Sequence, residues 1–248
     1  MEERLQKIIA NAGFTSRRAA EKLIVEGRVS VNNMVVKQLG TRANWQKDEI
    51  RIDGRLISCD QEKLYLMLYK PRGYVTTLND PQGRPIITTL LPGIRERVFP
   101  VGRLDYDSEG LLILTNDGDF ANKLQHPRFG IPKTYRVKIN GQMTARNIRA
   151  FESGIKLPDG LFRPDKFSVE KSNRKSCWFA LTISEGRNRV IRRALESMGY
   201  SVVRLIRMSI NSVQLGDLKE GDFRHLNSKE IRSLKAATSL QSPEDLCL

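Results

Sequence analysis

Hydrophobic and polar positions follow helical spacing at the start of the chain and then change to the spacing of strands. Apolar residues recur every three or four positions over residues 5–12 and 19–24, and the hydroxyl pair at 15–16 suits the N-cap of the second helix. Two apolar triplets then flank Asn32-Asn33, and asparagine tolerates the positive φ of a tight hairpin turn. With a further strand signal over 49–57, the pattern predicts a helix–turn–helix pair packed on a small layer of strands.

From residue 64 onward the pattern alternates repeatedly between strand and helix. Strands are expected at 64–69, 111–114, 134–139, 166–171, 177–183 and 202–210, and helices at 119–125, 144–152, 189–198 and 228–234. The two kinds of element interleave without a regular βαβ repeat. The expected fold class is therefore α+β, with a mixed sheet in the larger part.

The same pattern suggests how the chain is divided. The polar stretch 58–62 separates the two patterned regions and is interpreted as a linker. We expect a small domain over 1–60 and a larger domain over 63–236. The remaining residues, 237–248, are expected to form a disordered tail.

Several classes of protein are excluded by composition. The apolar runs are far shorter than the ~20 residues of a membrane span, and the charged start of the chain has no apolar core of a signal peptide. Three widely spaced cysteines form neither a disulfide framework nor a zinc motif, which fits a reducing compartment. We therefore expect a cytoplasmic protein without a membrane partner.

The charge of the chain changes this picture most. Lys and Arg number 42 against 28 Asp and Glu, a net charge of +14. Residues 1–60 hold 11 basic and 8 acidic groups and the remainder 31 and 20, so the excess is spread through both regions. Proteins this basic usually bind a polyanion, most often nucleic acid, although a basic surface that serves solubility alone is the alternative.

The predicted helix pair carries basic side chains on its outward positions, where they can contact phosphates. They are Arg4, Lys7, Arg17, Arg18, Lys22 and Arg28. Interspersed glutamates keep open the alternative of an ordinary solvated helix face.

A cluster of acidic residues, 102–110, stands directly before the predicted strand at 111–114. Asp105, Asp107 and Glu109 lie within five residues, but neighbouring side chains of an extended loop point in different directions and no histidine is close. A divalent-metal site, as in a metal-dependent nuclease, is one interpretation. The sharper one is a single catalytic aspartate, Asp105, at the edge of a buried strand.

A cluster of basic residues, 185–193, leads into the predicted helix at 189–198. Its arginines suit bidentate phosphate contacts, and Arg187 and Arg189 are the candidates. Val190 and Ile191 must face a core, so Arg192 beside them is expected to point inward. An inward arginine needs a carboxylate, because an unpaired buried charge is very costly. Asp105 is the expected partner.

These clusters, taken together, resemble the motifs of the RsuA/RluB-type ribosomal RNA pseudouridine synthases. The matching segments are Tyr69-Lys70-Pro71-Arg72-Gly73, Gly102-Arg103-Leu104-Asp105 with Ser108 to Leu112, Lys133 to Val137, Glu185 to Arg193, and Val203 to Arg207. The first sixty residues resemble the small RNA-binding domain of ribosomal protein S-four. These motifs, in the family's order and together with that domain, extend over nearly the whole chain.

The resemblance implies roles for individual residues. Asp105 matches the catalytic aspartate, which acts on the ribose either by adding to C1′ or by removing a ribose proton. Tyr135 matches the tyrosine that stacks on the uracil, and Arg192 matches the basic residue that pairs with the aspartate. Leu205 matches an apolar residue of the uracil pocket. In addition, Arg103 would hold RNA beside the flipped base, and Lys70 would contact RNA or support the pocket.

The implied function is isomerisation of a specific uridine to pseudouridine in ribosomal RNA, with ribosomal RNA or pre-ribosomal particles as the partner and a monomeric enzyme. No cofactor and no metal is expected, because the reaction needs neither a redox change nor an external group. Large-subunit RNA is favoured over small-subunit RNA as the substrate. A non-catalytic ribosome-assembly factor on the same fold is the alternative outside enzymology.

Overall fold

The computed structural model describes residues 2–58 and 61–239. The chain forms two compact units: one comprises residues 1–64, 93–98 and 116–118, and the other comprises 65–92, 99–115 and 119–248. None of the helices built by the described residues combines the length and the hydropathy needed to cross a membrane.

The first unit is a helix pair with short strands. Its elements are β1 (Glu3–Arg4), α1 (Leu5–Asn11), α2 (Arg17–Val25), β2 (Val29–Val31), β3 (Met34–Val36), β4 (Arg42–Ala43), β5 (Ile50–Ile52) and β6 (Arg55–Leu56). The sheet runs β3-β2-β5-β6 with antiparallel neighbours, and β1 pairs with β4.

Local sequence accounts for both turns of this unit. The side chain of Ser16 accepts a hydrogen bond from the Ala19 amide at 3.1 Å and so caps α2. Asn32 and Asn33 have φ values of 51° and 65°, the left-handed conformation that the β2–β3 hairpin requires. Apolar residues of both helices and of β2 and β5 form the core, including Leu5, Ile9 and Ile52. The expected helix–turn–helix and hairpin are confirmed.

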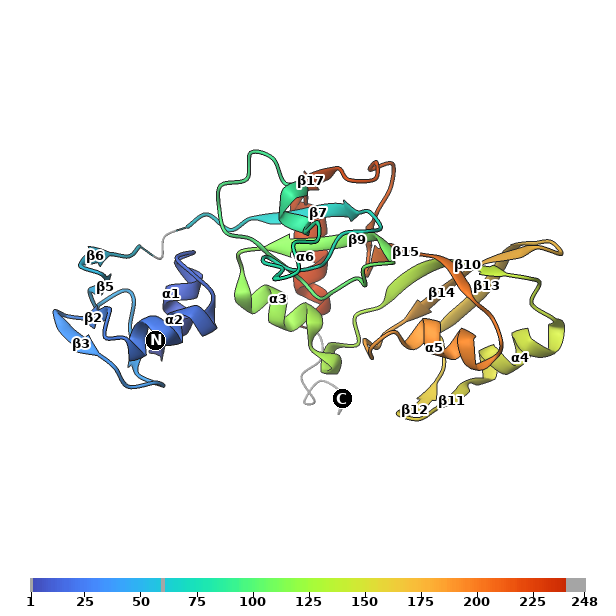
Figure 1. Ribbon diagram of the computed structural model, residues 1–248, viewed down its shortest axis with the longest axis horizontal. Helices are drawn as coiled ribbons and strands as arrows, with labels where there is room; N and C mark the ends of the chain where they lie inside the picture. The colour runs from blue at the N-terminus through green and yellow to red at the C-terminus, as the bar shows by residue number, and fades with distance from the viewer. Residues whose placement is uncertain (1, 59–60, 240–248) are drawn as a thin grey trace. The chain divides into compact units, whose positions relative to one another are not determined.

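A mixed sheet of nine strands, counted over the described residues, organises the second unit (Figure 1). Its main path is β13 (Lys166–Ser172), β14 (Ser176–Ile183), β10 (Lys133–Asn140), β15 (Val202–Ile210), β9 (Glu109–Thr115), β7 (Tyr65–Lys70) and β17 (Phe223–His225). The strands β8 (Phe99–Pro100) and β16 (Val213–Gln214) pair with β9 and β15 at the sides. Only the β9–β15 pair among them is parallel.

The helices of this unit follow the predicted segments. They are α3 (Gly118–Gln125), α4 (Ala145–Ser153), α5 (Val190–Ser197) and α6 (Ser228–Ala237), with single 3₁₀ turns at Ile87–Leu90 and Pro127–Phe129. A small hairpin of β11 (Ile155–Leu157) and β12 (Gly160–Phe162) completes it. The α+β class is confirmed. The short strands β8, β11, β12, β16 and β17 were not predicted, since two or three residues give no readable period. The expected disordered tail, 237–248, lies outside the described residues from 240 onward.

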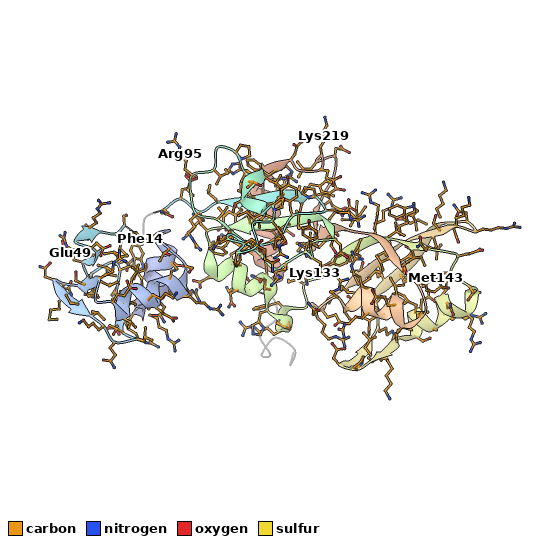
Figure 2. All side chains as sticks on the ribbon, in the orientation of Figure 1. Phe14, Glu49, Arg95, Lys133, Met143 and Lys219 are labelled. Carbon is orange, nitrogen blue, oxygen red and sulfur yellow. The ribbon has the colours of Figure 1, made fainter. Side chains whose placement is uncertain are left out.

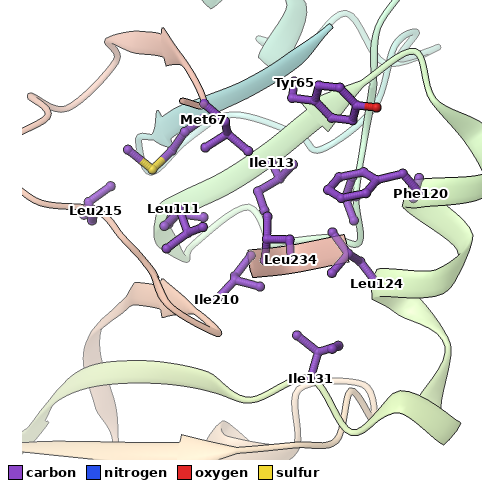
Figure 3. Close-up of a cluster of buried hydrophobic side chains, with 14 of the residues drawn as sticks. Tyr65, Met67, Leu111, Ile113, Phe120, Leu124, Ile131, Ile210, Leu215 and Leu234 are labelled. Carbon is purple, nitrogen blue, oxygen red and sulfur yellow. The ribbon is translucent and has the colours of Figure 1, made fainter. Parts of the chain in front are cut away.

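The core of the second unit lies around β9, all of whose residues are buried. Figure 3 shows Leu111 and Ile113 of this strand between Met67 of β7 and Leu234 of α6. Tyr65 and Phe120 meet edge to face at 4.9 Å between ring centroids, which adds about 1 kcal/mol beyond the area they bury. This rigid strand carries, at its amino end, the acidic loop identified in the sequence.

Candidate active site

A cavity of about 750 Å³ opens in the second unit. Its wall is formed by the loop before β9, the end of α3, the start of β10, the segment between β14 and α5, and one face of β15. The motif segments, far apart in the chain, therefore meet at one place. Seven residues proposed from the sequence line it: Asp105, Tyr135, Arg192, Leu205, Arg103, Arg187 and Arg189.

The last residue of β7, Lys70, and the segment that follows it hold the loop that carries Asp105. The Lys70 ammonium is completely buried and donates hydrogen bonds to the carbonyl oxygens of Asp105 (3.0 Å), Ser108 (2.8 Å) and Pro71 (3.0 Å). The Gly73 amide donates to the Tyr106 carbonyl at 2.8 Å. Burial lowers the pKa of Lys70 to about 8, although the three nearby carboxylates oppose that shift. Of the two roles expected for Lys70, the structure favours the supporting one: Lys70 does not line the cavity, and it fixes the backbone of the loop.

The two aspartates of the loop are paired with two different arginines. Arg189 Nη1 lies 3.4 Å from an Asp105 oxygen and 3.2 Å from an Asp107 oxygen. Arg192 points inward as expected, with 5% of its side chain exposed, but its Nη2 lies 3.2 Å from Asp107. It also donates to the Asp107 carbonyl at 3.0 Å and to Ser108 Oγ at 3.3 Å. The expected Arg192–Asp105 ion pair is therefore corrected: Asp107 is the partner of Arg192, and Arg189 is the partner of Asp105.

The third carboxylate of the acidic cluster is turned away from the other two. Glu109 is buried and accepts from Arg204 at 2.6 and 2.9 Å. No group of three metal-ligating side chains is found within the described part of the chain. The nuclease hypothesis, which needs Asp105, Asp107 and Glu109 to converge on one ion, is contradicted by this arrangement.

One face of the β10–β15 strand pair forms the deep wall of the cavity. Tyr135 of β10 lies directly opposite Arg207 of β15, and Leu205 precedes Arg207 by two residues on the same face. The pairing of β15 with β9 depends on Gly110, because a Cβ at that position would lie 2.4 Å from the Arg207 carbonyl oxygen. This close approach brings the Asp105 loop and the Tyr135–Leu205 wall to the same cavity.

Arg207 and Lys133 line the cavity but were not assigned a role from the sequence. A signal was available for Arg207: residues two apart on a strand share a face, so placing Leu205 in the pocket also places Arg207 there. Lys133 lies at the start of β10 (Figure 2) and donates to the Ile131 carbonyl at 2.9 Å. Burial, reinforced by the charge of Arg207 and only partly opposed by Asp165, lowers the pKa of Lys133 to about 8.

This shift gives a prediction about stability. The unfolded chain holds the Lys133 proton up to about its ordinary value of 10.5, so the charged ammonium destabilises the fold below pH 8 and ceases to do so between about 8 and 10.5. The free energy of unfolding of Lys133→Met, relative to that of the wild type, is therefore expected to be highest at pH 7 and to fall as the pH rises to 10. Urea unfolding of both proteins at pH 7, 8.5 and 10 measures this difference.

The loss of the Lys133–Ile131 hydrogen bond opposes the gain by about 1 kcal/mol at every pH, so the pH dependence is the informative quantity. Lys156→Met, at an exposed position of strand β11, is the matched control and should change the free energy of unfolding by less than about 0.5 kcal/mol. A difference between Lys133→Met and wild type that is constant over this pH range would contradict the prediction.

The other arginines proposed to contact RNA lie at the rim of the cavity. Arg103 is exposed beside Asp105. Arg187 is less available, because it forms an ion pair with Glu185 and a second one with Asp159 at 3.3 Å. Arg189 remains 39% exposed while it bridges the two aspartates.

The basic residues proposed in the first unit differ in their surroundings. Arg4, Arg17, Arg18 and Lys22 are exposed. Arg28, in contrast, is held by Asp53 at 2.6 Å, and Lys7 forms an ion pair with Glu3. A hollow of about 350 Å³ on this unit is lined by Arg4, Lys7, Arg17 and Arg42 together with Glu2, Glu3, Gln6 and Glu21, so this face carries both signs of charge.

Two parts of the chain match known protein families. Residues 64–197 match the family described as RNA pseudouridylate synthase, and residues 3–50 match the S4 domain. A solved structure described as a pseudouridylate synthase superposes with a TM-score of 0.66 at 31% identity and covers 93% of this chain and 99% of its own.

Relatives similar over almost their full length are found in bacteria. A Bacillus subtilis protein named ribosomal large subunit pseudouridine synthase B is 44% identical over 237 residues, which cover 94% of this chain and 96% of the relative. An RNA pseudouridine synthase of Aquifex aeolicus is 43% identical over 242 residues, 97% of each chain. A protein of Yersinia pestis with the same name as the Bacillus relative is 39% identical and covers 97% of this chain and 77% of its own.

Proposed function

Because this chain belongs to the RNA pseudouridylate synthase family, we propose that it converts a specific uridine of large-subunit ribosomal RNA to pseudouridine. The single observation that carries the choice of substrate is the Bacillus subtilis relative, whose name specifies the large ribosomal subunit and which aligns with this chain nearly end to end. The family that the motifs suggested from the sequence is confirmed by the family match.

Asp105 is the residue we propose for the chemical step. It is the aspartate that lines the cavity together with Tyr135 and Leu205, and 34% of its side chain is exposed. Its backbone carbonyl is anchored by Lys70, so the carboxylate is presented from a fixed loop. A carboxylate held in this way can add to C1′ of the ribose or remove a ribose proton, and either event breaks the bond between C1′ and N1.

The uridine must leave its RNA helix to reach this cavity. Extrusion of a nucleotide costs a few kcal/mol, which phosphate contacts and stacking must offset. We propose that Tyr135 stacks on the flipped uracil, that Leu205 packs against its edge, and that Arg103 at the rim holds the neighbouring phosphates. The S4 domain binds RNA. We assign this contact to its exposed Arg4, Arg17, Arg18 and Lys22.

The mapping of pseudouridines in both ribosomal RNAs, from cells with and without this protein, tests the proposal. We expect one large-subunit uridine to lose its pseudouridine signal in the deletion strain and to recover it when the wild-type protein is restored. Expression of the Asp105→Asn variant in the deletion strain should leave that position unmodified. These cells also provide the RNA for assays in vitro.

Other outcomes of the mapping decide between the alternatives. Loss of a small-subunit pseudouridine would replace the proposed substrate by small-subunit RNA. An unchanged map together with defective ribosome assembly would indicate a non-catalytic factor. We further propose that the enzyme works as a monomer and acts in the cytoplasm, where a bacterial ribosomal RNA substrate is found.

A further inference from the structure

Arg207 is a buried cation without a carboxylate partner. Its side chain lies on β15 and the residue is 3% exposed. The Nε atom donates to the Leu111 carbonyl at 2.7 Å, whereas Nη2 is shielded from solvent and has no hydrogen-bond partner. No ion pair links Arg207 to an acid anywhere in the described residues. An unpaired buried guanidinium is costly for stability, so its retention calls for a ligand that supplies an acceptor.

The position of Arg207 specifies where this acceptor must be. Arg207 lies between the two residues proposed to hold the base, opposite Tyr135 across the strand pair and two residues after Leu205. The neighbouring Lys133 adds a second positive charge to the same wall. A group bound between Tyr135 and Leu205 therefore meets a free N–H donor and a positive potential.

The reaction creates a negative charge in this space. When the C1′–N1 bond breaks, its electron pair stays with the uracil, which becomes an anion with charge spread over N1, O2 and O4. Asp105 makes up for the electron pair that C1′ loses. It either bonds to C1′ as an adduct or removes a ribose proton to give a glycal. The ring then turns and C5 bonds to C1′, as the Asp105 ester breaks or as the glycal regains a proton at C2′. The proton on C5 then leaves to a base and N1 takes up a proton, so atoms and charge balance.

We propose that Arg207 is a further catalytic residue, whose free Nη2 donates a hydrogen bond to a carbonyl oxygen of the uracil and stabilises the departing anion. The proposal rests on the proposed role of Asp105 in breaking that bond. A donor already oriented toward the site of developing charge needs no rearrangement during the reaction. An RNA phosphate fits the position less well, because Arg207 is nearly inaccessible while Arg103 and Arg189 are exposed at the rim.

The test compares two leaving groups on an RNA fragment that the wild-type protein modifies. One fragment carries uridine at the target and the other 5-fluorouridine, whose fluorine makes the departing anion a weaker base. Under single-turnover conditions with saturating enzyme, Arg207→Gln is expected to consume uridine ~10²- to 10³-fold more slowly than wild type. The deficit should shrink at least about tenfold with 5-fluorouridine, since a better leaving group needs less stabilisation.

Two variants provide the controls. Arg207→Lys retains the charge without the planar donor pair and should show a smaller deficit with the same dependence on the leaving group; it also keeps the test decisive if the Gln variant does not fold. Arg136→Gln removes an exposed arginine of β10, paired with Glu170 at 2.6 Å, and should stay within about twofold of wild type, because it lies outside the cavity.

Three results would overturn the proposal. Equal deficits with both nucleosides would assign Arg207 to positioning alone. A second such result is weaker RNA binding whose log–log slope against salt concentration is reduced by about one unit. It would indicate that Arg207 contacts a phosphate. Unchanged turnover in both Arg207 variants would leave it without a role in the reaction. Failure of the wild type to modify any large-subunit fragment is a different result, which refutes the proposed substrate and not the role of Arg207.

Discussion

Replacement of Asp105 by asparagine is expected to lower the rate of pseudouridine formation by at least ~10³-fold, while the affinity for RNA stays within a few fold. The amide has nearly the shape of the carboxylate but can neither add to C1′ nor accept a ribose proton. The loop should keep its path, because Lys70 binds the backbone carbonyl of residue 105 and not its side chain. The loss of the partly exposed ion pair with Arg189 changes stability by less than about 1 kcal/mol.

Single-turnover assays with saturating enzyme, together with a binding titration on the same RNA, separate the two quantities. Asp107→Asn is the informative comparison, since it removes a charge from the same loop at a residue whose side chain is paired with both Arg189 and Arg192. It should be much less damaging than Asp105→Asn. If Asp105→Asn retained substantial turnover, the assignment of Asp105 would have to be abandoned.

Replacement of Arg192 by alanine is expected to lower saturated turnover by ~10²-fold with little effect on RNA affinity. The Arg192 guanidinium holds the loop at three points: the Asp107 carboxylate, the Asp107 carbonyl and Ser108 Oγ. Its removal frees the segment that follows Asp105, and a displacement of about 1 Å in a reacting group is enough for a loss of this size. Arg192 thus acts through Asp107 and Ser108 as a positioning residue.

A surface contact with phosphate would behave differently. It would weaken RNA binding, reduce the salt slope by about one unit and leave saturated turnover intact. Arg193→Ala is the matched control from the next position of α5, where the guanidinium is paired with Asp159 at 2.8 Å and does not line the cavity. We expect this control to stay within a few fold of wild type. Near-normal saturated turnover in Arg192→Ala would refute the positioning role.

The apolar pattern and the motifs were sufficient to predict the fold class, the order of the main elements and the family. Apolar patterns predicted every described element of six or more residues, because most of these elements bury one face and repeat their apolar positions at 3.6 or 2 residues. The inward direction of Arg192 followed from Val190 and Ile191, and the burial of all three is observed. Period-two alternation on β15 also carries the signal that places Arg207 beside Leu205, which the prediction from the sequence missed.

Tertiary structure alone decided how the charges are paired. Asp105 and Asp107 are two residues apart, so nothing in the sequence indicates which of them Arg192 reaches. That choice depends on the path of the loop, set by the bonds of Lys70 beneath it and the Ser108 amide bonded to the Asp105 carbonyl at 3.0 Å. Lys70 likewise belongs to a motif in the sequence, but only the structure shows that it is buried and that it binds the backbone of the loop. Ion pairs and buried donors join residues tens of positions apart, and a local pattern carries information only about neighbours along the chain.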